Sequence, residues 1–366
     1  MKKVNSKNER IKRAYLTYLK EAGRKSVASV DQVAAAIAEF ERYAKRKDFA
    51  LFHIEQARGF KVFLADQRHP NTGKPLAVAT VHSKLMALKA FFIWLADRPG
   101  YKSRIHYTDA DYFNPSANDS RIATATRNQP APTLEQIRHV LDIMPGETDI
   151  QRRDKAIVAF TIVTGARDAA IASLRLKHVD LATRSVFQDG REINTKNRKT
   201  FTTTFFPVGA DIETIVCDWV AYLKSDKLFG PDAPLFPSTR VALNEGGMFG
   251  AAGLTRSHWK NANAIRAIFR KAFEAAGLPY SNPHLFRNTL VQLGQTTCRT
   301  PEEFKAWSQN LGHEQVLTTF TSYGSVATQR QAEIISSFSS QDGAAEPRKD
   351  DFNQLAVLIK RLQNRG

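Results

Sequence analysis

The chain has 366 residues, with 53 lysines and arginines against 36 acidic residues, and a net charge of +17 at pH 7. A hydrophobic content of 42% and an aromatic content of 10% exclude a disordered chain. The length accommodates two domains, each with its own core. The positive surplus favours a polyanionic partner, and nucleic acid ranks before a membrane because no anchor is visible. A merely basic, soluble protein is the alternative at this stage.

The two cysteines, Cys217 and Cys298, lie far apart and outside any metal-ligand spacing. This usage predicts a reducing compartment, with neither a disulfide framework nor a cysteine-rich zinc site. The N-terminus is charged rather than apolar, and no run approaches eighteen apolar residues. We therefore expect a cytoplasmic protein that is not secreted and does not span a membrane.

Apolar residues at helical spacing predict four helices in the first third of the chain, at residues 9–22, 30–43, 54–67 and 80–95. The last of these carries a strongly apolar face with several aromatic residues. We expect these rings to form a core rather than a platform for stacking bases. The first fifty residues hold 13 basic and 6 acidic side chains, which favours contact with a DNA backbone over a merely solvated helix face.

Helical periodicity is lost over residues 114–132, where proline, asparagine and serine accumulate as in an interdomain linker. Thr133 and Gln136 then have the spacing of a capping box that opens a helix. The chain is therefore divided into a helical domain at 1–113, a linker at 114–132 and a second domain at 133–340. Residues 341–366 are expected to be a tail with an amphipathic segment.

The second domain is predicted to be mixed. β-Branched and aromatic residues over 185–207, around a turn at Asp189–Gly190, predict a small antiparallel sheet. The glycine-containing stretch 244–253 lacks the pattern of a nucleotide-binding loop and is expected to be a flexible loop. An apolar run occupies 156–163, and helical patterns occupy the following segments: 169–176, 212–223, 259–276 and 326–338.

Residues that can bind a phosphate, transfer a proton or act as a nucleophile are concentrated between Ser281 and Tyr323. His284 and Arg287 are three residues apart, so on a helix they share one face and can address one anion. His313 follows a leucine and a glycine, and Tyr323 lies ten residues later. An arginine offers a fork of donors for phosphate oxygens, an imidazole transfers protons near neutral pH, and a tyrosine oxygen can attack as a nucleophile.

Each of these residues also has an ordinary explanation when taken alone. Arg167, after Thr-Gly-Ala, can be a surface arginine, and His313 can simply end a helix. Tyr323 can be a half-buried tyrosine, and Lys196 a solvated lysine on a hairpin. A metal site built from His284 and His313 is disfavoured because no carboxylate or cysteine cluster accompanies them.

Taken in order, the set resembles the tyrosine recombinase (phage integrase) family. The resemblance covers both domains. It implies a mainly α protein with a small antiparallel β-sheet: a SAM-like helical core-binding domain, followed by an α+β catalytic domain. It assigns the catalytic site to these residues: Arg167, Lys196, His284, Arg287, His313 and the nucleophile Tyr323.

Three departures from the family pattern stand out. The family usually has an acid three positions after its first arginine, where this chain has Ala170, and whether the nearby Asp168 substitutes is open. The tyrosine follows the histidine by ten residues rather than nine. Lys199 is an alternative to Lys196 as the catalytic lysine.

The resemblance implies that a 3′-phosphotyrosyl intermediate carries the bond energy, so that neither a metal nor another cofactor is required. It also implies double-stranded DNA with specific sites as substrate, and a tetramer on paired sites. The end of the second domain, or the tail from Phe352 to Leu362, is a candidate subunit contact. Packing of the tail on its own subunit or on a membrane is the alternative. A type IB topoisomerase and a catalytically silent DNA-binding protein are the alternatives.

Overall fold

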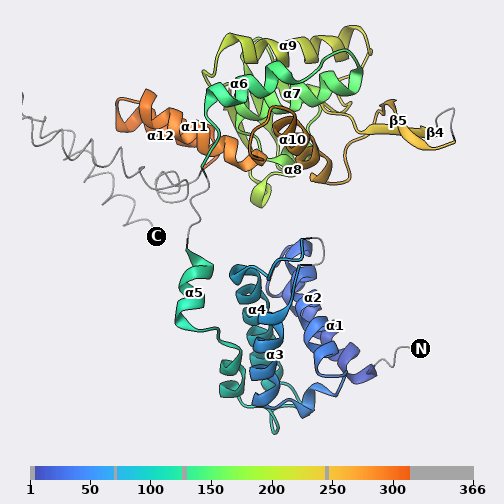
Figure 1. Ribbon diagram of the computed structural model, residues 1–366, viewed down its shortest axis with the longest axis vertical. Coiled ribbons are helices and arrows are strands. Elements are labelled where there is room, and N and C mark those ends of the chain that lie inside the picture. The colour runs from blue at the N-terminus through green and yellow to red at the C-terminus, as the bar shows by residue number, and fades with distance from the viewer. Residues whose placement is uncertain (1–4, 70–71, 126–129, 244–246, 314–366) are drawn as a thin grey trace, which may run out of the picture. The chain divides into compact units, whose positions relative to one another are not determined.

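The computed structural model describes residues 5–69, 72–125, 130–243 and 247–313. It divides into two compact units, Met1–Thr126 and Arg127–Gly366 (Figure 1). The predicted tail and the predicted helix at 326–338 lie outside the described residues. The fold class is mainly α with small antiparallel sheets, as the sequence predicts.

The described part of the first unit is helical. Its helices are α1 (Ser6–Glu21), α2 (Val27–Tyr43), α3 (Ile54–Asp66), α4 (Val78–Ala96) and α5 (Ala117–Thr124), with 3-10 turns η1 (Phe49–Leu51) and η2 (Tyr107–Phe113). The first four confirm the helices predicted from apolar spacing. Helix α5 lies within the segment predicted to be a linker. Ser116 is its N-cap, and Ser116 Oγ accepts from Asp119 N–H at 3.0 Å, which stabilises the first turn.

An aromatic cluster forms the core of the first unit. Phe91 and Phe92 of α4 are fully buried and contact Phe49, Phe52 and Tyr15. The rings meet mostly at tilted or edge-to-face angles, which suits their quadrupoles. Helix α4 is long and apolar enough to cross a membrane by length and composition, but its aromatic face is used in this core. The prediction that the rings are core residues is confirmed.

The second unit combines helices with two small sheets. Its helices are α6 (Leu134–Ile143), α7 (Asp149–Thr164), α8 (Asp168–Ile171), α9 (Ala210–Ser225), α10 (Asn263–Ala275), α11 (Pro283–Thr297) and α12 (Pro301–Asn310), with 3-10 turns η3 (Leu176–His178) and η4 (Lys196–Arg198). The capping box that opens α6 is confirmed: Thr133 Oγ1 accepts from Gln136 N–H at 3.2 Å, and Gln136 Oε1 accepts from Thr133 N–H at 3.0 Å. The helical pattern at 169–176 becomes only the single turn α8.

The three-stranded sheet is antiparallel in the order β1 (Val179–Asp180), β2 (Ser185–Gln188), β3 (Phe201–Thr204). Val186 of β2 pairs with Val179 and Thr203. The link between β2 and β3 runs from residue 189 to 200 and contains η4, so it is far longer than a tight turn at Asp189–Gly190. Both candidate lysines lie in this link, which we call the lysine segment.

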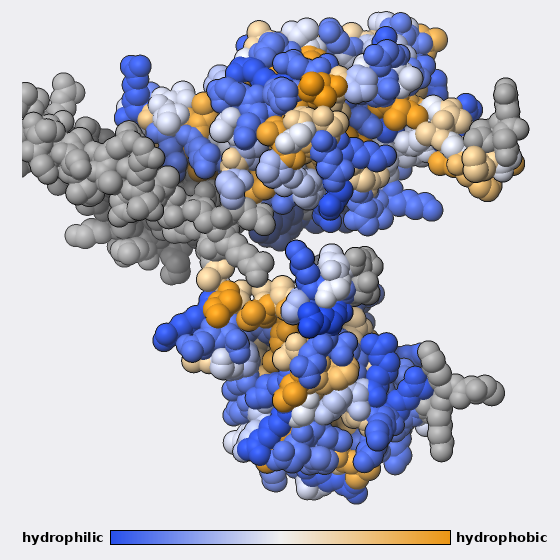
Figure 2. Space-filling model, viewed as in Figure 1, coloured by the Kyte–Doolittle hydropathy of each residue, from blue (hydrophilic) through white to orange (hydrophobic). Residues whose placement is uncertain are grey.

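The stretch predicted to be a flexible loop is in part a strand. β4 (Thr239–Leu243) and β5 (Phe249–Leu254) form a second antiparallel sheet, which projects from the second unit (Figure 1). Small residues such as Gly250 and Ala251 carry little strand propensity, so pairing with β4 decides the outcome. Hydrophobic side chains gather along this hairpin (Figure 2), including Val241 and Phe249, which are exposed.

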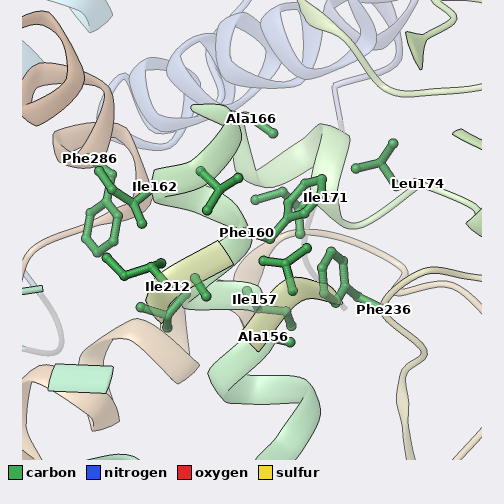
Figure 3. Packing of buried hydrophobic residues seen from close by; sticks show 14 of the residues in the cluster. Ala156, Ile157, Phe160, Ile162, Ala166, Ile171, Leu174, Ile212, Phe236 and Phe286 are labelled. Atoms are coloured by element: carbon green, nitrogen blue, oxygen red, sulfur yellow. The ribbon is translucent and has the colours of Figure 1, made fainter. Parts of the chain in front are cut away.

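Almost every residue in the second half of α7 is buried, which shows that the helix runs through the core of the second unit. Phe160 packs against Phe236 with ring centroids 5.2 Å apart, and Figure 3 shows it among Ile157, Ile171 and other aliphatic side chains. Burial on all sides holds the C-terminal end of α7 rigidly. That end carries the Thr-Gly-Ala-Arg motif.

Candidate active site

The end of α7 places Arg167. Gly165 ends the helix in the left-handed conformation, with φ 60°, and its N–H donates to Thr161 O at 2.9 Å. A Cβ on Gly165 would lie 2.8 Å from Leu311 and 3.0 Å from Leu290. Glycine is therefore required both by the turn and by the close approach of α11 and the end of α12. Arg167 follows in an extended conformation as the N-cap of α8.

Helix α11 carries the His-x-x-Arg pair on its first turn. Pro283 opens the helix, and the Asn282 side chain caps it by accepting from the His284 N–H at 2.9 Å. His284 is exposed, whereas Arg287 is only 2% exposed. The pair therefore extends from the surface into the protein, as expected for residues three apart on one helix face.

The Arg287 guanidinium joins three segments of the chain. Nη1 donates to Gly165 O at the end of α7, and Nη2 donates to Leu311 O at 2.6 Å. Nη2 also lies 2.9 Å from His313 Nε2. Its Nε is buried without a hydrogen-bond partner among the described residues. A buried cation requires such partners, so Arg287 is both a structural centre and a local positive charge.

His313 is brought to Arg287 by the end of α12. Gly312 has φ 74°, and a Cβ there would lie 2.7 Å from the Phe201 ring. The His313 side chain is 6% exposed, and burial together with the charges of Arg287 and Arg167 lowers its pKa to about 3. Since Arg287 can only donate, Nε2 accepts, and the neutral ring carries its proton on Nδ1.

Helix α12 is also bonded to the sheet that carries the lysine segment. Asn310 Oδ1 accepts from Thr204 N–H at 2.7 Å, and its Nδ2 donates to Thr204 O at 2.8 Å. Thr203 Oγ1 donates to Asn310 O at 3.0 Å. These bonds fix β3 next to the end of α12, and so bring the lysine segment close to His313.

The two candidate lysines approach different histidines. Lys196 is exposed, and its charge contributes to lowering the pKa of His284. Lys199 is half-buried, donates to Gly312 O at 3.4 Å, and contributes to lowering the pKa of His313. The larger causes of the lowered His284 pKa are desolvation and then the charges of Arg287 and Arg167. Lys199 thus contacts the segment that carries His313, and the structure does not select between the two lysines.

The position where the family pattern has an acid is occupied by Ala170, which is buried in α8. Asp168 Oδ2 instead accepts from Arg266 Nε on α10 at 2.7 Å. A cavity of about 440 Å³ lies beside Arg167 and His284, with Arg266 in its lining. Sequence reasoning missed Arg266, because nothing in the helical pattern of α10 distinguishes it from other basic residues on that face.

The sequence-predicted site is therefore brought together as far as the structure describes it. Arg287 Nη2 lies 2.9 Å from His313 Nε2, Arg167 and His284 line the same cavity, and α11 carries both His284 and Arg287. Arginine side chains are the type that binds an anion such as phosphate, and Arg287 is held in place by protein carbonyls. Tyr323 lies outside the described residues.

A family model described as the phage integrase family matches residues 133–330. The chain belongs to the phage integrase family. This match covers every candidate site residue, from Arg167 to Tyr323. Comparison with curated protein sequences gave no match.

Solved structures of integrases share the fold. A lambda integrase(75–356) dimer bound to a COC′ core site is 11% identical with a TM-score of 0.59, over 93% of this chain and 99% of that one. The Tn1549 transposon integrase in complex with transposon right end DNA is 14% identical with a TM-score of 0.56, over 90% and 99%. The likeness extends over both units of this phage integrase family member.

Proposed function

We propose that the protein is a site-specific tyrosine recombinase, which cuts and rejoins DNA strands during integration or excision of a DNA element. The observation that carries the proposal is that α11 links Arg287, which contacts His313, to His284, which lines one cavity with Arg167. Membership of the phage integrase family and the net charge of +17 support DNA as the substrate.

In the proposed reaction, Tyr323 Oη attacks the scissile phosphorus. A bond forms between that oxygen and phosphorus while the bond from phosphorus to the 5′ oxygen breaks, leaving a 3′-phosphotyrosyl strand and a 5′-hydroxyl. Charge grows on the non-bridging oxygens in the transition state. Arg167 and Arg287 stabilise it, and because Arg287 is already held by protein carbonyls, little reorganisation is needed.

Protons move through the remaining residues. The lowered pKa of His284 keeps the imidazole neutral near pH 7, so it can accept the tyrosine proton. His313, protonated on Nδ1 in the free protein, is a donor to the phosphate. Lys196 gives a proton to the leaving 5′ oxygen, and Lys199 is the alternative donor. No metal or other cofactor is needed, because the phosphotyrosine keeps the energy of the broken bond.

The proposed substrate is double-stranded DNA with specific recombination sites, bound in the cytoplasm by a tetramer of this chain. The helical unit, proposed as 1–113, and the catalytic domain, proposed as 133–340, both contact the duplex. Accessory DNA-bending proteins are expected to bias the direction of exchange. The lambda and Tn1549 integrase structures, both solved with DNA, support DNA as the partner.

The test uses nicked duplexes of the DNA that flanks the gene, in which cleavage releases a short fragment and traps the covalent complex. Wild type and Tyr323→Phe are compared on a denaturing gel. We expect a protein–DNA adduct with the wild type and none with the variant, since phenylalanine lacks the attacking oxygen.

An adduct that persists in Tyr323→Phe would place the nucleophile elsewhere. Binding without any adduct in the wild type would favour a catalytically silent DNA-binding protein. Relaxation of plasmids that lack a specific site, without strand exchange between two duplexes, would favour a type IB topoisomerase.

A further inference from the structure

The lysine segment is attached to the core of the second unit and to the residue that follows α8. Ile193 is fully buried in the core of the second unit. The next residue, Asn194, donates its N–H to Ser173 Oγ at 2.9 Å. Ser173 in turn follows α8, whose N-cap is Arg167. The backbone just before Lys196 is thus tied to the element that presents the first arginine.

Glu192 makes the second attachment. Its carboxylate accepts from Lys177 Nζ at 2.8 and 3.0 Å, lies 3.1 Å from His178 Nε2, and lies 3.8 Å from Arg175 Nη1. His178 is almost fully buried, and its Nδ1 accepts from Arg175 N–H at 3.0 Å. The neutral ring therefore carries its proton on Nε2 and donates it to Glu192. The three partners all lie in or beside η3.

The lysine segment is also closed on itself. Gly190 N–H donates to Thr200 Oγ1 at 2.9 Å, and Thr195 Oγ1 donates to Lys199 O at 2.7 Å. A Cβ on Gly190 would lie 1.9 Å from Arg198 O, so the two ends of the segment approach too closely for any side chain there. Movement at its attached end is therefore transmitted to both lysines.

We propose that Glu192, assisted by Ser173, is a positioning residue that sets where the lysine segment presents its ammonium group to the scissile phosphodiester. The inference rests on the proposed function, because it concerns the proton that goes from lysine Nζ to the 5′ oxygen. As the bond between phosphorus and that oxygen breaks, the ammonium becomes a neutral amine and the oxygen becomes a hydroxyl. Neither Glu192 nor Ser173 touches the DNA in this step.

Changing the leaving atom from oxygen to sulfur distinguishes a residue that positions the proton donor from one that stabilises the fold in general. An alkoxide is a poor leaving group and needs the proton, whereas a thiolate is stable near neutral pH and leaves without one. A duplex with sulfur in place of the bridging 5′ oxygen therefore removes the need for a well-placed lysine. It leaves the demands on the arginines and the nucleophile unchanged.

The experiment compares adduct formation by the full chain on nicked duplexes of the flanking DNA, with oxygen or sulfur at the phosphodiester that the wild type cleaves. The variants are Glu192→Ala and Ser173→Ala. The matched control is Asp232→Ala, because Asp232 also pairs with Arg175 and Lys177 but belongs to the loop before Pro234 rather than to the lysine segment. Affinity for the duplex, measured alongside, reports folding.

We expect Glu192→Ala and Ser173→Ala to slow cleavage of the oxygen duplex by about tenfold or more, and that of the sulfur duplex by less than about twofold. Asp232→Ala is expected to stay within about twofold of the wild type on both duplexes. Equal slowing on both duplexes, or no slowing on either, would overturn the positioning role. A wild type that forms no adduct with either duplex would overturn the proposed function itself.

Discussion

Arg287 is nearly unexposed, yet it carries a full charge that the surrounding backbone must compensate. Carbonyl oxygens of Gly165 and Leu311 do so from two different segments, and His313 contributes a lone pair. Removing one partner of a buried charged group costs more than a surface interaction is worth. Arg287 therefore stabilises the fold at the point where we propose that it also stabilises the transition state.

The choice between Lys196 and Lys199 is testable with the same sulfur chemistry. We expect Lys196→Met to slow cleavage of the oxygen duplex by about a hundredfold or more, and sulfur to restore most of the rate, because the proton donor is then dispensable. Lys199→Met is the matched variant from the same segment. The measurement is the cleavage rate on the two duplexes. If sulfur restored the rate of Lys199→Met but not that of Lys196→Met, Lys199 would be the proton donor in place of Lys196.

The pKa of His313, lowered to about 3, predicts that stability falls in mild acid. Below the unfolded-state pKa near 6.5, the unfolded chain binds a proton that the folded site rejects, so stability present above that pH is progressively lost as the pH falls. From about pH 7.5 to about pH 5, His313 alone should cost about 2 kcal/mol.

Urea unfolding followed by tryptophan fluorescence in a Trp94→Phe background measures this, because Trp219, Trp259 and Trp307 all lie in the second unit. Adding His313→Gln should remove this part of the pH dependence. The same pH dependence with and without His313 would contradict the prediction.

At the residue level, spacing and residue type predicted which side chains gather. The helical repeat puts His284 and Arg287 on one face, whereas Arg167 is assigned to the site only by the resemblance to the tyrosine recombinase family. The partner of Asp168 could not be predicted, because Arg266 is 98 residues away and its contact depends on how α10 packs. The two lysines also could not be separated, since both lie on a segment longer than the sequence indicated.

Among the elements, the end of α7 is the most constrained. Gly165→Ala would force a side chain into the left-handed region and against Leu311 and Leu290. We expect it to lower the free energy of unfolding by about 2 to 4 kcal/mol. The control is Gly146→Ala, where a Cβ would meet nothing within 4 Å, and the expected change is within about 0.5 kcal/mol.

Urea midpoints of the two variants provide the measurement. A Gly165→Ala protein as stable as the wild type would mean that α11 and the end of α12 can move away from α7. In that case the rigid framework inferred for Arg287 would be wrong.

The elements that the sequence predicted are those with strong apolar periodicity, such as α1 to α4 and α9. Those that it missed are decided by pairing rather than pattern. β5 contains two glycines and two alanines and becomes a strand only against β4. Helix α5 is short and capped by Ser116 within a stretch rich in helix breakers, so composition alone indicated a linker.

For the whole molecule, the net charge of +17 predicts binding that depends steeply on salt. If six or more phosphates are neutralised, affinity for a duplex should fall about a thousandfold between about 50 and about 200 mM salt. The preference for the specific site over an unrelated duplex should change far less, since base contacts release few ions. Fluorescence anisotropy with both duplexes measures this, and a nearly flat salt dependence would argue against extensive backbone contact.

The structural contacts of Arg287 have a consequence for any descendant of this chain that keeps them. A descendant that had lost strand cleavage but kept its fold would still need this arginine, because the carbonyls at the ends of α7 and α12 depend on it. Its presence therefore says little about activity. Lys196 is exposed, and its ammonium makes no hydrogen bond within the described residues. If Lys196 is the proton donor, as we propose, relaxed selection would erase it before Arg287, and its presence would be the more informative marker of strand cleavage.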